Sequence, residues 1–112
     1  MKMKNFDYDK MTDSLFISRK GPGEKVQGSA EVGNLVIDFT GDGKIVNTEF
    51  RNISKFLEMM KFDQGILNDL TGASLMVQQQ RGAVSIFALL KTPSLEQPIP
   101  LATLPMAQSL SP

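Results

Sequence analysis

The chain of 112 residues contains no cysteine and no histidine. Their absence excludes disulfide bonds, thiol nucleophiles, thiolate or imidazole metal ligands and imidazole general bases. Any catalysis would have to use carboxylates, lysine, tyrosine, serine or threonine, and any metal site would have only oxygen ligands. Because no polar residue is isolated within an apolar run, the sequence favours a protein that is not an enzyme and that carries no cofactor.

The chain also lacks an excess of either charge and a long apolar run. Twelve basic and twelve acidic residues give a formal net charge of zero, so we expect no binding to nucleic acid or to an anionic membrane. The longest apolar runs, such as Ala83–Leu90, are far too short to span a bilayer. The first residues carry lysines without an apolar stretch behind them, which predicts no secretory signal and a cytoplasmic protein.

Length and composition are typical of one folded domain. A chain of this size can bury roughly two-thirds of the surface that it exposes when unfolded, so it needs no metal or disulfide to fold. We therefore expect a single domain over residues 1–112, in which residues 106–112 form a flexible tail.

Short strands joined by glycine-rich turns dominate the first half. The clearest hairpin joins residues 35–39 to residues 45–50 through Gly41-Asp42-Gly43, whose glycines can supply positive φ angles. Shorter strands are expected at Phe6–Tyr8 and Ser14–Ser18, and residues 26–32 form an edge strand or a loop.

A helical segment near residues 54–70 follows, capped by Asn52 or Ser54 and then by Asp63 in a second short turn. Residues 73–78 and 83–90 form another hairpin around Arg81-Gly82, and four prolines after it make a long final strand unlikely, with only residues 99–101 as an edge strand. The pattern predicts an α+β fold: an antiparallel β-sheet of about six to seven short strands with one helical segment packed on it.

Residues 38–49 also fit part of a twelve-residue calcium loop. Oxygen-bearing side chains occupy positions one, three, five and twelve, a glycine occupies position six, and the ligands would be Asp38, Thr40, Asp42 and Glu49. The flanking segments are predicted strands rather than helices, and a strand rising ~3.3 Å per residue carries Glu49 away from the turn. A hairpin turn is therefore the favoured interpretation, and binding of calcium or magnesium is the alternative.

Three further clusters have a plain structural interpretation beside a functional one. Asp7, Asp9 and Asp13 could bind a cation, but short acidic side chains at such positions usually cap turns. Residues 20–25 are basic and rich in glycine, but they lack the Gly-Lys-Ser/Thr ending of a phosphate-binding loop. Residues 78–81 could form an exposed recognition edge, although a solvated turn is favoured.

Several of these motifs, in this order, resemble an uncharacterised prokaryotic family called domain of unknown function 2283, over roughly residues 6–55: Tyr8-Asp9, Asp13-Ser14-Leu15-Phe16-Ile17, Val36-Ile37-Asp38-Phe39, Asp42-Gly43-Lys44-Ile45-Val46 and Glu49. The chain departs from the family at Phe16, where a tyrosine is frequent, and at Thr40-Gly41, where the turn is usually more acidic. The resemblance implies a small antiparallel β fold and provides no catalytic residue.

The most apolar predicted strand, Ala83–Leu90, has apolar residues on both faces. A small single-layer sheet covers only one face, and a second subunit is a simple cover for the other. We therefore expect a non-catalytic, self-associating protein-interaction module, a homodimer that leaves room for an unidentified protein partner. The expected interface residues are Val84, Ile86, Phe87, Leu89 and Leu90.

Overall fold

The structure, a computed structural model, describes residues 4–105. The predicted α+β class is confirmed, with antiparallel strands and a helical segment between them. The elements are β1 (Phe6–Asp9), β2 (Ser14–Ser18), β3 (Gly28–Val32), β4 (Leu35–Phe39), β5 (Ile45–Arg51), α1 (Ile53–Met59), the 3-10 helix η1 (Gln64–Asn68), β6 (Gly72–Gln80), β7 (Ala83–Lys91) and β8 (Glu96–Pro105). The tail predicted at residues 106–112 lies outside the described residues. No helix within residues 4–105 is long and apolar enough to cross a membrane.

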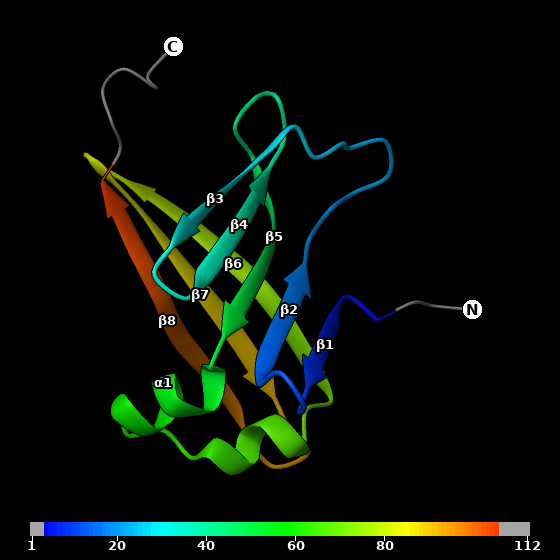
Figure 1. Cartoon of the computed structure of the whole chain (residues 1–112), viewed down its shortest axis with the longest axis vertical. Helices are drawn as coiled ribbons and strands as arrows, with labels where there is room; N and C mark the ends of the chain where they lie inside the picture. The colour runs from blue at the N-terminus through cyan, green and yellow to red at the C-terminus, as the bar shows by residue number, and fades with distance from the viewer. Residues whose placement is uncertain (1–3, 106–112) are drawn as a thin grey trace.

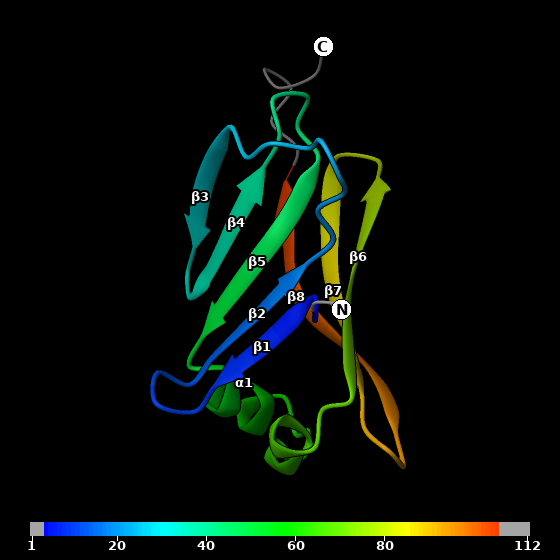
Figure 2. The same ribbon diagram turned by 90° about the vertical axis from the view of Figure 1, so that its right-hand side faces the viewer.

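The strands form two sheets rather than the single sheet that the sequence pattern suggested. One sheet has five strands in the order β1-β2-β5-β4-β3, and the other has three in the order β6-β7-β8. The sheets face each other as two layers, and α1 and η1 close one end of the space between them (Figures 1 and 2). The apolar core therefore lies between the sheets and above the helices.

Alternation along the strands explains this arrangement. In β2, Leu15 and Ile17 are buried and Phe16 is exposed, and in β7, Ile86 and Leu90 are buried while Phe87 and Leu89 alternate with them on the opposite face. The inward residues of both sheets belong to one core cluster. The inner face of β7 is thus covered by the chain itself, and the expectation of a second subunit concerns only the outer face.

The start of α1 is held by a residue far away in the sequence. Asn52, at φ 57°, precedes the helix without a side-chain cap, so the predicted capping by Asn52 or Ser54 is wrong. Instead the Asp13 carboxylate accepts hydrogen bonds from the Ser54 amide (3.2 Å) and the Ser54 hydroxyl (2.7 Å). The second predicted cap is confirmed, because Asp63 accepts from the Gly65 amide at the start of η1.

The last strand is longer than the sequence pattern predicted. β8 contains Pro98, Pro100 and Pro105, yet it pairs with β7 along its length. It does so as the edge of its sheet. A proline without an amide donor is tolerated on an edge strand whose N–H side faces away from the ladder, which is why the expectation of only a short pairing at residues 99–101 was wrong.

The hairpin predicted between residues 35–39 and 45–50 is confirmed as β4 and β5. Its turn is closed by the Thr40 amide, which donates to the Lys44 carbonyl (2.9 Å), and by the Gly43 amide, which donates to the Thr40 carbonyl (2.9 Å). Gly43 adopts a positive φ of 88°, whereas Gly41 does not adopt one. Only the second glycine of the turn is therefore required by backbone conformation.

Candidate functional site

The four residues of the calcium-like pattern do not converge on one point. Asp38 lies on the outer face of β4, where its carboxylate accepts from Ser29 (2.7 Å) and Asn47 (3.1 Å). Thr40 is buried in the turn and its hydroxyl donates to the Asp42 carboxylate. That hydrogen bond lowers the pKa of Asp42 below its usual range.

Glu49 completes the calcium-like pattern, and it lies on the outer face of β5 beside Arg51, 3.8 Å away. Extended backbone separates it from the turn, as strand geometry requires. Within residues 4–105, no group of three or more acidic side chains is arranged to hold a metal ion.

The three aspartates near the start of the chain do not form one cluster: two are exposed on β1, and the third is hydrogen-bonded to other side chains. Asp7 and Asp9 are exposed on β1. Asp13 is turned inward, where it accepts from the Tyr8 hydroxyl (2.7 Å) as well as from Ser54. Burial and this hydrogen bond to a carboxylate raise the pKa of Tyr8 to about 12. A phenol with so high a pKa stays protonated at neutral pH and can keep donating its hydrogen bond to Asp13.

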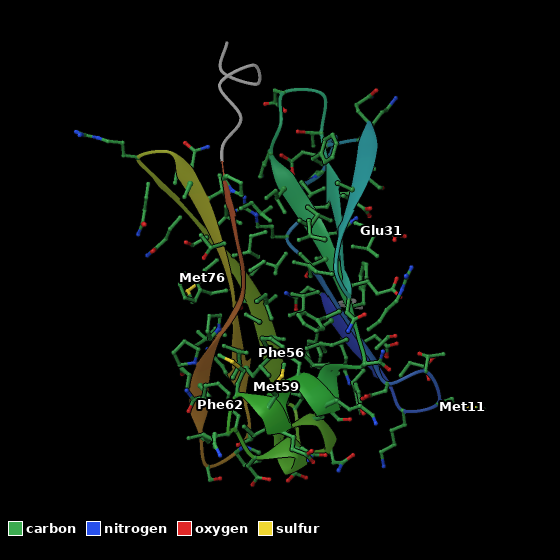
Figure 3. All side chains as sticks on the ribbon, turned by 60° about the vertical axis from the view of Figure 1, so that its left-hand side comes forward. Met11, Glu31, Phe56, Met59, Phe62 and Met76 are labelled. Carbon is green, nitrogen blue, oxygen red and sulfur yellow. The ribbon has the colours of Figure 1, made fainter. Side chains whose placement is uncertain are left out.

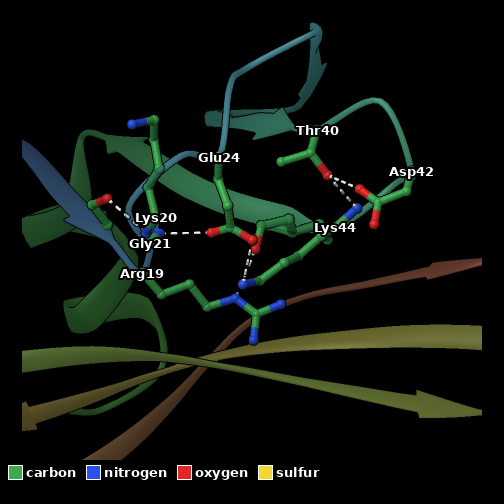
Figure 4. Close-up of polar contacts among 9 residues, drawn as sticks. Arg19, Lys20, Gly21, Glu24, Thr40, Asp42 and Lys44 are labelled. Carbon is green, nitrogen blue, oxygen red and sulfur yellow. Dashed lines mark hydrogen bonds and ion pairs between the residues drawn. The ribbon is translucent and has the colours of Figure 1, made fainter.

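A cluster of polar side chains joins the loop before β3 to the turn between β4 and β5 (Figure 4). Glu24 is its centre, because its carboxylate accepts from the Gly21 amide (2.6 Å) and from the Lys44 ammonium (2.8 Å). The hydrogen bond from Lys44 is the main reason why the pKa of Glu24 is lowered. Arg19 donates through Nε to the Ile45 carbonyl (2.6 Å). These contacts are made to other side chains and to the backbone, which indicates that they hold the loop before β3 against the turn between β4 and β5.

The cavities of the described chain offer little to a small ligand. One hollow of about 370 Å³ lies beside this cluster and is lined by Gly23, Glu24, Lys25, Gln27, Thr40, Gly41 and Asp42. Another of about 250 Å³ lies between β1 and η1 and is lined by Lys4, Phe6, Asp7, Tyr8, Lys10, Leu67, Asn68 and Leu70. Neither has the mostly apolar walls and few converging polar groups that are typical of a binding pocket.

The expected interface residues are split between the core and the surface. Ile86 and Leu90 are 0% and 1% exposed and belong to the core between the sheets, so both are corrected here: they cannot contact a second subunit while the fold is intact. Val84 is half-buried and packs against the same core. Phe87 and Leu89 lie on the outer face of β7.

Phe87 and Leu89 belong to a larger apolar strip on the outer face of the three-stranded sheet. Met76 of β6 and Pro100 of β8 lie directly opposite Phe87, and Pro98 lies opposite Leu89. We call these five residues the apolar strip. The sequence interpretation missed Met76, Pro98 and Pro100. Because the turn at Arg81-Gly82 has two residues, counting back from it along both strands already pairs Met76 with Phe87. The residues of β7 that face β8 could not be found by such a count.

Comparison with known proteins agrees with the resemblance found in the sequence. Residues 5–54 match the model of a family described as protein of unknown function (DUF2283). No curated protein and no solved structure is significantly similar to the chain. The matched residues build the whole five-stranded sheet and the start of α1, whereas the three-stranded sheet lies beyond them. The match thus covers one layer of the fold and carries no activity.

Proposed function

We propose that the protein is a non-catalytic interaction module that forms a homodimer through the apolar strip. The observation that carries this proposal is the position of the strip on a sheet face over which no other described element lies (Figure 2). An antiparallel sheet with one face in the core normally alternates to polar side chains on the other face. A contiguous apolar patch on such a face is typical of a protein–protein contact.

The composition of the strip favours a second copy as its partner. Phe87 lies between Met76 and Pro100 in one cross-strand row, and Leu89 lies between Ser74 and Pro98 in the next. Neither row contains a charged side chain, so nothing in the strip selects a charged partner. An uncharged flat surface can face its own copy across a two-fold axis without repulsion, and two-fold dimers are the commonest oligomers.

The size of the strip sets the expected strength of the dimer. Three strands ~4.8 Å apart, along which the strip extends over about three residues of ~3.3 Å, give an area of roughly 140 Å² per subunit. Stable specific interfaces bury about 800 Å² per partner, so the strip falls well below that size. We therefore expect a weak, reversible dimer with a dissociation constant in the micromolar range or above.

Sedimentation equilibrium over a concentration series tests this proposal with a matched pair of variants. Phe87→Ser removes the centre of the strip and is expected to give a monomer at every concentration. Phe16→Ser removes the exposed phenylalanine on the opposite outer face and is expected to leave the dimer intact. Circular dichroism of both variants checks that the fold is retained.

A second substitution protects the test against a folding defect, because Phe87 is partly buried. Met76 is 37% exposed, so Met76→Lys is expected to preserve the fold and to place two like charges across the interface. A parent chain that stays strictly monomeric up to about 500 µM, a concentration at which such a contact would be populated, contradicts the proposal. A dimer that persists in Phe87→Ser and Met76→Lys contradicts the choice of surface.

A further inference from the structure

A single row of side chains crosses the outer face of the five-stranded sheet and alternates between acidic and apolar. Direct cross-strand pairing places its members side by side in the order Asp7, Phe16, Glu49, Val36 and Glu31, one from each strand. We call this the acidic row. Phe16 is 38% exposed and no described element lies over this face, which is turned toward the viewer in Figure 1. Glu31 and Met76 project on opposite sides of the molecule (Figure 3), so the acidic row and the apolar strip are separate surfaces.

The face that carries the row is strongly negative although the chain as a whole is neutral. Asp9 and Asp38 also project outward from these strands, and together with the row they give five carboxylates. Arg51 is the one basic residue that β1–β5 turn to this face, and it lies 3.8 Å from both Glu31 and Glu49. Five negative charges against one positive charge leave this face with an excess of four negative charges. Such a field repels nucleic acid and anionic lipid and attracts a cationic partner.

The spacing within the row distinguishes between kinds of cationic partner. The three carboxylates are two strands apart, which corresponds to about 9.6 Å, and one apolar side chain lies midway in each gap. In an α-helix, residues i and i+7 share a face about 10.5 Å apart, and residue i+3 or i+4 falls between them. An extended strand repeats its face every ~6.8 Å and does not fit. Over the full row a helix differs from the sheet by about 2 Å, which long lysine and arginine side chains can span.

From this match we infer that the acidic row docks a basic amphipathic helix of another protein. The helix carries Lys or Arg at positions i, i+7 and i+14, opposite Asp7, Glu49 and Glu31. Apolar residues near i+4 and i+11 cover Phe16 and Val36. A second copy of the described chain does not supply this helix, because α1 has seven residues and a single lysine. The inference does not depend on the homodimer, since the two surfaces lie on opposite layers.

Binding of designed peptides tests the inference directly. The probe is a labelled helical peptide of about 18 residues, a length at which alanine-rich helices become stable, with Lys at i, i+7 and i+14 and Leu at i+4 and i+11. A scrambled peptide of the same composition is the control for charge alone. Fluorescence anisotropy is expected to show the patterned peptide binding at least about tenfold tighter than the scrambled one, with affinity falling as salt is raised.

Variants of the full chain locate the site. Glu49→Gln keeps the shape of the side chain and is expected to weaken binding about two- to fivefold, the effect of one exposed ion pair. Phe16→Ser is expected to weaken it about tenfold through loss of the apolar contact. Phe87→Ser, on the opposite layer, is expected to bind the peptide as the parent does.

Each other outcome overturns the inference. Equal binding of both peptides means that only the net field acts, and absence of binding at millimolar peptide means that the face does not take a helix. Unchanged affinity in Phe16→Ser and Glu49→Gln places the peptide elsewhere. Loss of the dimer in Phe16→Ser means that this face is occupied by a second copy of the chain.

Discussion

The hydrogen bond between Tyr8 and Asp13 can be observed by titration of the whole protein. The chain has one tyrosine and no tryptophan, so the ultraviolet absorbance of tyrosinate reports on Tyr8 alone. The ordinary pKa of the phenol is 10.0, and burial followed by the hydrogen bond to the Asp13 carboxylate raises it to about 12. We therefore expect half of the tyrosinate signal to develop near pH 12 in the folded protein and near pH 10 in denaturant.

The same shift predicts how stability depends on pH at the alkaline end. Because the folded pKa lies above the unfolded one, this contact stabilises the fold fully below about pH 10, and its contribution is lost as the pH rises from about 10 to about 12. Deprotonation removes the donor and places a phenolate beside a carboxylate 2.7 Å away. The free energy of unfolding, measured by urea denaturation, should therefore fall across this window.

Asp13→Asn separates the two causes of the raised pKa. The amide keeps the shape of the side chain and tolerates the positive φ of 53° at this position, but it removes the negative charge. The titration midpoint of Tyr8 should fall from about 12 while remaining above 10.0, because burial is the larger cause and stays. Circular dichroism in the same samples distinguishes titration of the folded state from unfolding. A Tyr8 titration midpoint at pH 10 in the parent protein, while it is still folded, would refute the Tyr8–Asp13 contact.

The remaining predictions concern stability and are checked by urea denaturation at neutral pH. Asp13→Ala removes the cap of α1 and strains a positive φ, so it should cost about 3 kcal/mol, more than Asp13→Asn. Gly43→Ala should cost about 1–2 kcal/mol because its φ is 88°, whereas Gly41→Ala, where the new Cβ meets only the flexible side chain of Gln27, should change stability by less than about 0.5 kcal/mol. Ile86→Ala should cost about 2–5 kcal/mol, since Ile86 is fully buried, and a cost below about 1 kcal/mol would contradict its place in the core.

Local pattern was sufficient for the two hairpins and for the region of the helices. The turns at Gly41-Asp42-Gly43 and Arg81-Gly82 are short, so alternation on either side fixes the pairing without knowledge of the rest of the fold. The cap at Asp63 is likewise local, since it bonds two residues ahead.

Features that depend on distant parts of the chain were not accessible in this way. Asp13 caps α1 through hydrogen bonds from Ser54, 41 residues later, and nothing in the spacing of either segment indicates that contact. β2 pairs with β5 rather than with its neighbour β3, which is what makes five strands a single layer and leaves the other three to form a second. The sequence therefore showed that β7 has two apolar faces but not which of them the chain covers itself. Because the sequence did not show that the five-stranded sheet covers one face of β7, Ile86 and Leu90 were assigned to an interface.

The two layers of the fold come from different parts of the chain: the five-stranded sheet from the segment that matches the family model, and the three-stranded sheet from the residues after it. The five-stranded sheet, within residues 5–54, has an inner face of large aliphatic residues such as Leu15, Ile17 and Leu35, which are each 1% exposed. Inward residues of the three-stranded sheet, such as Ile86 and Ile99, share one core with them, and they come from beyond the matched segment. That second sheet in turn has an apolar outer strip over which no other element of residues 4–105 lies. Each sheet covers the inner face of the other, and in the proposed homodimer a second copy of the chain would cover the outer strip. The acidic row, on the layer that the family match covers, is left free by such a dimer, which would present two negative faces pointing away from each other.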